Sequence, residues 1–174
     1  MTMRIRRETE TDREAVEGLV FRAFDLPNHD GREEAALVRA LRQSREYLPA
    51  LSLVAEVDGT LAGHILFTEL WVGDSRLVAL APLAVDPPFQ GRGVGGALIR
   101  EGHRIAAEAG FPGSVVLGHA AYYPRFGYRP ASRFGIRAPF ETDDAHFLAA
   151  ELIEGGLRGV EGTARYAPEF GIDD

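Results

Sequence analysis

The chain has 174 residues, 45% of them apolar and 26% charged, which is enough material for one ordinary hydrophobic core. We therefore expect a single domain over residues 1–174. Acidic residues outnumber basic ones 26 to 19, for a net charge of −7, so we expect no nucleic-acid partner. Every basic residue is arginine and no cysteine occurs, which excludes Schiff-base lysines, disulfides and cysteine nucleophiles.

The N-terminal residues lack the apolar segment of a signal peptide, and no stretch approaches 18 consecutive apolar residues. These features predict a cytoplasmic protein without a membrane partner. We expect a monomer or a homodimer.

The order of elements predicts a mixed α/β layer and not a regular β-α-β winding. A capping box at residues 11–14 opens a helix with an apolar stripe at Val16, Leu19 and Val20. Asp58-Gly59 joins two β-branched runs and is a strong hairpin signal. A later helix begins at Val94, and a short helical segment covers residues 122–126. The expected strands cover residues 4–7, 52–57, 61–72, 77–85, 114–117 and 159–166.

Four glycines lie within the six residues from Gly91 to Gly96, between a strand end and a helix start. Such a loop leaves backbone N–H groups unobstructed, and the helix dipole favours an anion in front of them. Gly95 and Gly96 fall in the first helical turn, where glycine costs about 1 kcal/mol relative to alanine. An anion site explains this cost better than a flexible turn does.

Gly91, Gly93 and Gly96 also spell the G-x-G-x-x-G motif of dinucleotide-binding folds. The motif lies mid-chain after a hairpin, and residues 111–118 offer no acidic group for a ribose hydroxyl. Too few residues remain for six parallel strands. The sequence therefore disfavours a Rossmann unit.

Residues 83–95, which read LAVDPPFQGRGVG, resemble the acyl-coenzyme A segment of the GNAT superfamily of N-acetyltransferases. A second block, YYPRFGY at residues 122–128, resembles the aromatic-Tyr-x-x-x-Gly-aromatic segment of that family. The resemblance extends to about Tyr128 and is uninformative beyond Pro130. It implies a GNAT-like α/β fold with a mixed central sheet, helices on both faces, and fourth and fifth strands that splay apart.

The resemblance also implies a role for each part of the first block. The strand edge would pair with the pantetheine arm, Gln90 would brace the loop, and the loop would bind the pyrophosphate. The implied coenzyme residues are Leu83, Ala84, Val85, Gln90, Gly91, Arg92, Gly93, Val94, Gly95 and Gly96. Pro82 independently indicates a bulge, because proline removes a ladder donor from the strand.

The implied activity is direct transfer of an acetyl group from acetyl-coenzyme A to an amine within a ternary complex. We expect Tyr123 to assist departure of the thiolate and Tyr122 to point elsewhere. His119 is the candidate general base, with His64 and Glu69 as alternatives. No histidine lies in a metal-binding sequence motif, so no metal is expected. The alternative is a coenzyme A-binding regulator without catalysis.

Four acidic residues, Asp25, Asp30, Glu33 and Glu34, lie around the first helix and a second expected helix that Asp30 and Glu33 can cap. The resemblance implies that this region lines the acceptor side, so the four residues would favour a cationic amine as acceptor. The alternative interpretation is an ordinary solvated acidic face. GNAT proteins often have an asparagine before the tyrosine block, but here residues 118–121 read GHAA. A side-chain clamp on the coenzyme arm is therefore not expected from that position.

Overall fold

The computed structural model describes residues 1–172. This range contains three α-helices, nine β-strands and several short 3₁₀ turns. The helices are α1 (Arg13–Phe24), α2 (Arg32–Leu41) and α3 (Val94–Glu108). The strands are β1 (Met3–Arg7), β2 (Tyr47–Val57), β3 (Thr60–Val72), β4 (Ser75–Val85), β5 (Gly113–Leu117), β6 (Arg129–Pro130), β7 (Ile136–Arg137), β8 (Phe147–Glu151) and β9 (Gly162–Arg165).

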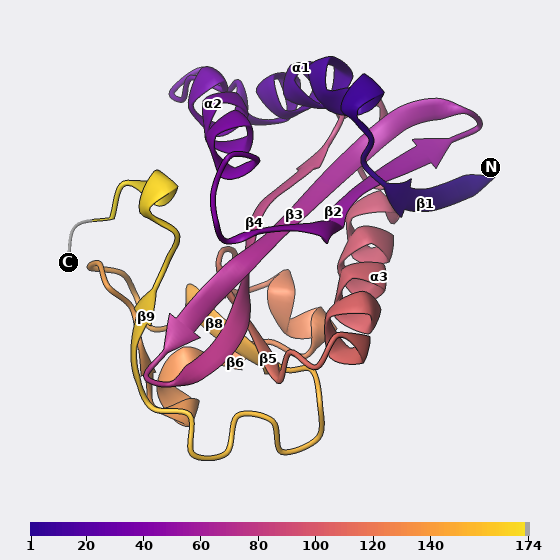
Figure 1. Cartoon of the computed structure of the whole chain (residues 1–174). Coiled ribbons are helices and arrows are strands. Elements are labelled where there is room, and N and C mark those ends of the chain that lie inside the picture. The colour runs from indigo at the N-terminus through magenta and orange to yellow at the C-terminus, as the bar shows by residue number, and fades with distance from the viewer. Residues whose placement is uncertain (173–174) are drawn as a thin grey trace.

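The main sheet has the strand order β1-β2-β3-β4-β5-β8-β6. Neighbours from β1 to β4 are antiparallel, the β4–β5 pair is parallel, and β8 is antiparallel to β5. Helices α1 and α2 cover one face of the sheet, and α3 covers the other (Figure 1). The predicted mixed α/β architecture with helices on both faces is confirmed.

Helix packing follows the apolar stripes of the sequence. On α1, Val16, Leu19 and Val20 are buried against Val54 of β2 and Ala84 of β4. Helix α3 lies so close to β3 that a Cβ on Gly102 would stand 2.3 Å from the ring of Phe67. The absence of a side chain at Gly102 therefore allows α3 to pack closely against β3.

Strand β4 contains a bulge next to Pro82. Ile65 pairs with Leu83 and Phe67 pairs with Leu80, so β4 has one residue more than β3 over this stretch. Beyond the bulge β4 also parts from β5, since their register is limited to Val78–Ser114 and Ala79–Val115. The last residues of β4 therefore have a neighbour on one side only, and the expected splay between the two strands is confirmed.

The structure also has strands β6, β7 and β8, which the sequence did not predict, and β2 begins earlier than expected, at Tyr47. Two further details differ. The capping box involves Thr9 and Asp12, because the Asp12 carboxylate accepts a hydrogen bond from the Thr9 amide at 2.7 Å, and it caps the 3₁₀ turn Glu10–Asp12 that precedes α1. The last strand is also shorter than predicted, because only Gly162–Arg165 pair with β3 and β7.

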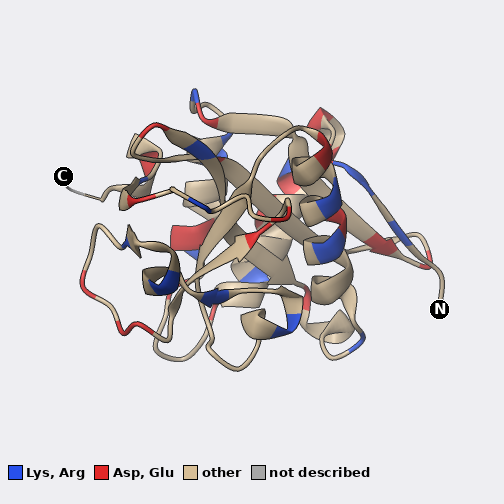
Figure 2. Cartoon of the chain, turned by 90° about the horizontal axis from the view of Figure 1, so that it is seen from below, with Lys and Arg blue, Asp and Glu red and all other residues tan. Residues whose placement is uncertain are grey.

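Charges are interspersed over the chain. Acidic and basic residues both occur on helices, strands and loops (Figure 2). In residues 1–172 no helix combines the length and the apolar character that crossing a bilayer requires.

Candidate active site

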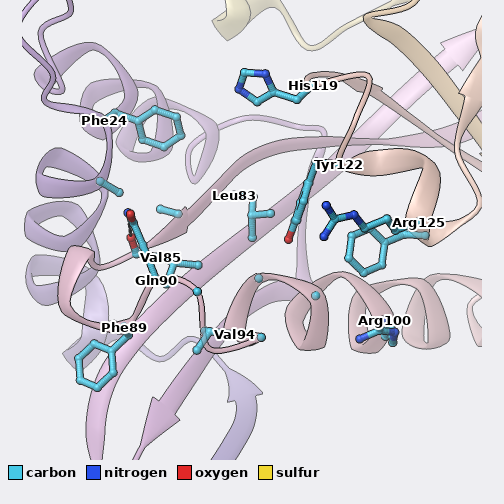
Figure 3. Close-up of a pocket in the computed structure, with 17 residues that line it drawn as sticks. Phe24, Leu83, Val85, Phe89, Gln90, Val94, Arg100, His119, Tyr122 and Arg125 are labelled. Atoms are coloured by element: carbon cyan, nitrogen blue, oxygen red, sulfur yellow. Dashed lines mark hydrogen bonds between the residues drawn. The ribbon is translucent and has the colours of Figure 1, made fainter.

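A cavity of about 760 Å³ lies at the point where β4 and β5 part. Its walls come from the end of α1, the last residues of β4, the start of α3 and the segment around the 3₁₀ turn η3 (Tyr123–Phe126). In Figure 3, Phe24 of α1 and Tyr122 stand on opposite sides of the cavity with Leu83 between them. Segments up to about 100 residues apart in sequence thus meet at one site.

The β4 side of the cavity consists of Leu83, Ala84 and Val85. Because β4 has no partner on this side, its backbone is available to an extended ligand. Gln90 lies on the same wall, and its side-chain amide donates a hydrogen bond to the Val85 carbonyl at 3.0 Å. This bond holds the start of the glycine loop against the end of β4.

The glycine loop connects β4 to α3 and needs glycine for two different reasons. Gly91 (φ +76°) and Gly93 (φ +82°) adopt the left-handed conformation that side chains disfavour, and Gly93 is the N-cap of α3. At Gly95 a Cβ would stand 2.7 Å from the Tyr122 hydroxyl. The loop therefore presents the first turn of α3, whose N–H groups lack partners within the helix, directly to the cavity.

Two arginines lie on the cavity wall beside the glycine loop. The Arg100 guanidinium stacks 5.0 Å from the ring centroid of Phe126, and that of Arg125 lies 5.8 Å from the Tyr122 ring. The Arg92 guanidinium packs near Phe89 instead, 5.7 Å from its ring centroid. The end of the cavity at the glycine loop thus carries more positive charge than the loop alone provides.

The two adjacent tyrosines occupy different places. Tyr122 lies on the cavity wall (Figure 3), so the expectation that it points elsewhere was wrong. Tyr122 precedes the 3₁₀ turn as its N-cap, and the rotation per residue of an α-helix does not apply there. Tyr123 packs over Gly118, at the end of β5, and its ring meets Tyr128 edge to face at 5.6 Å. It does not line the cavity, and burial raises the pKa of its phenol to about 12.

The three candidate bases lie in three different environments. His119 is exposed and lies on the cavity wall. His64 is buried away from the wall, with Nε2 3.2 Å from the Ser52 hydroxyl. Glu69 pairs with Arg76 at 2.8 Å and accepts a hydrogen bond from the Trp71 indole. Of these three candidates, the structure therefore brings only His119 to the cavity.

Residues 18–128 match the model of the Acetyltransferase (GNAT) family. The chain belongs to this family. The GNAT chain is 33% identical to the uncharacterized N-acetyltransferase YhbS of Escherichia coli K12 over 171 residues, covering 97% of this chain and 98% of that protein. It is 46% identical to the uncharacterized N-acetyltransferase YjhQ of the same organism over 119 residues, 66% of either chain. This membership makes the protein an acyltransferase.

Solved structures of GNAT proteins superimpose closely on this one. The crystal structure of Escherichia coli YhbS in complex with CoA aligns with a TM-score of 0.88 and 31% identity, over 97% of this chain and 92% of that one. A GNAT acetyltransferase from Brucella melitensis in complex with acetyl-CoA aligns with a TM-score of 0.79 and 32% identity, over 97% and 98%. The likeness therefore includes the region after Pro130 that the sequence left unassigned.

The four acidic residues around α1 and α2, Asp25, Asp30, Glu33 and Glu34, do not line the cavity, and most of them are paired within the protein. Asp30 forms an ion pair with Arg32 at 2.7 Å, which lowers the pKa of Asp30 to about 2. Glu34 pairs with His29 at 2.5 Å and raises the pKa of that imidazole. The Asp25 carboxylate accepts a hydrogen bond from the Gly31 amide. These contacts reduce, but do not abolish, the negative electrostatic potential around α1 and α2.

Sequence reasoning missed Arg100 and Arg125 as cavity residues of the GNAT chain. Arg100 follows Gly96 by four positions, so the two lie on one helix face, and this spacing was the available signal. Arg125 offered no such signal, because its position depends on the path of η3.

Proposed function

We propose that the protein transfers an acetyl group from acetyl-CoA directly to the amine of a bound acceptor. The observation that carries this proposal is the single cavity that joins a left-handed glycine loop at a helix N-terminus to the unpaired edge of β4. A helix N-terminus binds an anion, and an open strand edge binds an extended amide chain. Acetyl-CoA offers both groups in this order, as pyrophosphate and pantetheine.

The residues on the wall fit the coenzyme part by part. We assign Leu83, Ala84 and Val85 to the pantetheine arm and the loop from Gly91 to Gly96, braced by Gln90, to the pyrophosphate. Arg100 and Arg125 are added to Arg92 as donors to phosphate oxygens. The supporting observations are the location of these two arginines on the wall and the hydrogen bond from Gln90 to Val85.

The proposed chemistry is a single transfer step. The neutral amine nitrogen of the acceptor attacks the thioester carbonyl carbon, a C–N bond forms, and the C–S bond breaks as the tetrahedral intermediate collapses. His119 receives the proton that the amine loses. No cysteine, serine or threonine is found among the cavity-lining residues of the described chain, which supports direct transfer without an acyl-enzyme intermediate.

Tyr123 is the proposed hydrogen-bond donor to the departing thiolate, as the resemblance implies, although its ring packs behind the wall residue Tyr122, with the ring centroids 5.1 Å apart. Its ring lies at the end of β5, next to the point where the strands part, and its hydroxyl makes no hydrogen bond to the other described residues. A phenol with a pKa near 12 stays protonated at neutral pH and can donate. Tyr122, on the wall, would instead contact the coenzyme arm.

The acceptor in this proposal is a cationic amine that approaches from the side of Asp25, Asp30, Glu33 and Glu34. The net charge of −7 supports attraction of cations. The cytoplasmic location and a monomeric or homodimeric state stay predictions from the sequence.

A thermal shift titration with CoA, followed by an acetyl-CoA assay on a panel of amines, tests the proposal. A ligand present at 100 times its Kd should add about 2.7 kcal/mol of stability. We expect stabilisation by CoA together with release of free thiol in the presence of at least one amine. Stabilisation without transfer to any amine would favour a coenzyme-binding regulator, and absence of stabilisation at millimolar CoA would exclude both functions.

A further inference from the structure

Asp86 occupies a fixed place between β4 and the glycine loop. Its amide donates a hydrogen bond to the Ala62 carbonyl at 2.8 Å, and its own carbonyl accepts one from the Phe89 amide at 2.8 Å. Its side chain is only 13% exposed. Asp86 directly follows β4, and Gln90, four residues later, reaches back to Val85, so Asp86 belongs to the turn that joins β4 to the glycine loop.

Arg22 of α1 neutralises this carboxylate. The guanidinium makes two parallel hydrogen bonds, from Nε to Oδ1 and from Nη2 to Oδ2 of Asp86, each 3.0 Å long. The Arg22 side chain runs back over Gly18, where a Cβ would stand 3.3 Å from Nη1. Among residues 1–172 this is the one ion pair that links α1 to β4 or to the glycine loop.

The pair also joins two walls of the cavity. Ala23 and Phe24, which follow Arg22 directly, line the cavity from the α1 side, whereas Leu83 to Val85, which precede Asp86, line it from the β4 side. The Arg22 side chain is 52% exposed, whereas the carboxylate that it pairs with is largely buried. The bidentate contact therefore supplies the partner that a buried carboxylate requires at the junction of the two walls.

We propose that Arg22 is a positioning residue for the coenzyme site, which cancels the charge of Asp86 beside the anion-binding loop and ties the α1 wall to that loop. An unpaired carboxylate there would repel the coenzyme pyrophosphate. The ion pair also transmits coenzyme binding to α1, the wall on the acceptor side. This inference rests on the proposed function, because it takes CoA as the ligand of the loop.

A double-mutant cycle on CoA binding, measured by titration calorimetry, tests the charge effect. Arg22→Gln leaves Asp86 unpaired and should raise the Kd for CoA by about 3- to 10-fold at low salt. Asp86→Asn should leave the Kd unchanged or lower it. The double variant Arg22→Gln/Asp86→Asn should recover the affinity of the parent protein, which a loss of structure at Arg22 would not allow.

Arg104→Gln is the matched control. It removes the same charge from an exposed ion pair that lies about 15 Å from the start of α3. Equal effects of Arg22→Gln and Arg104→Gln on the Kd, or no recovery in the double variant, would overturn the proposal. If the parent protein itself does not bind CoA, the proposed function fails instead, and the two failures are distinguishable.

Hydrogen exchange tests the link to α1. In the parent protein, CoA should slow amide exchange in residues 18–25, whereas in Asp86→Asn this protection should disappear while CoA still binds. Arg22→Lys keeps the charge but loses the bidentate geometry, so it should bind CoA with nearly the parent affinity and lose the protection. Equal protection of α1 in all these proteins would overturn the link.

Discussion

The side-chain amide of Gln90 donates a hydrogen bond to the backbone carbonyl of Val85, and this 3.0 Å contact closes the turn between β4 and the glycine loop. Gln90→Ala removes the contact and should loosen the loop. We expect the Kd for CoA to rise about 5-fold, as the loss of one hydrogen bond of about 1 kcal/mol predicts. Gln43→Ala, at an exposed position after α2, is the control and should leave the Kd unchanged.

A comparison of two glycines in the left-handed conformation can distinguish a role in backbone geometry from a role in ligand binding. Gly93 (φ +82°) and Gly159 (φ +74°) both have open space where a Cβ would lie, but only Gly93 is at the cavity. Alanine at either position should lower the free energy of unfolding by about 1–2 kcal/mol. Only Gly93→Ala should also weaken CoA binding, by about 10-fold or more. If calorimetry gives both variants the same Kd, the loop is a turn without a coenzyme role.

The two tyrosines can be told apart by removing one hydroxyl at a time. Tyr123→Phe keeps the ring against Tyr128 and should lower kcat by about 10²- to 10⁴-fold with little change in CoA affinity. Tyr122→Phe should change kcat by less than that. Steady-state kinetics with any amine found in the panel checks both variants, and the reverse pattern would assign the leaving-group role to Tyr122.

A buried polar cluster holds α2 against the sheet and predicts a pH dependence. Burial opposes the charge of Glu8, but the imidazole of His64 at 3.7 Å and hydrogen bonds from Ser52 and Arg42 outweigh it and lower the pKa of Glu8 to about 2. This contribution to stability is complete above the unfolded pKa near 4.5 and is lost as the pH falls towards 2. In urea unfolding, Glu8→Gln should cost about 3–5 kcal/mol at pH 7.

The same variant should show a flatter stability profile between pH 4.5 and 2 than the parent protein. Glu10→Gln, an exposed carboxyl close in sequence, serves as the control. If the free energy of unfolding changed equally with pH in Glu8→Gln and in the parent protein over this range, Glu8 would not be responsible for the pH dependence.

The salt dependence of kcat/KM should show whether the acceptor is cationic. Attraction of a cationic amine by Asp25, Asp30, Glu33 and Glu34 is screened over about 10 Å at 0.1 M salt. The kcat/KM of a cationic acceptor should therefore fall as the salt concentration rises at saturating acetyl-CoA. The internal pairs of Asp30 and Glu34 make this dependence modest. Salt-insensitive turnover of a neutral amine would identify the four residues as a solvated face.

Local patterns in the sequence were sufficient for much of the fold. The Asp58-Gly59 turn, the apolar stripe of α1 and the proline in β4 each depend on neighbours within a few residues, and the hairpin, the buried face and the bulge all appear where they were expected. The glycine loop was identified for the same reason, because backbone freedom and helix capping are properties of a short segment.

The tertiary structure alone decided which side chains share a site. The ion pair of Arg22 with Asp86 spans 64 positions, and β8 joins β5 only after a long excursion of the chain. His64 and His119 have the same chemistry, yet one is buried in β3 beside Ser52 and the other lies on the cavity wall. The sequence determined most elements before Tyr128 and the glycine loop because their interactions are local, whereas strands β6 to β8 and the side-chain contacts between distant segments depend on how those elements pack, which local periodicity does not specify.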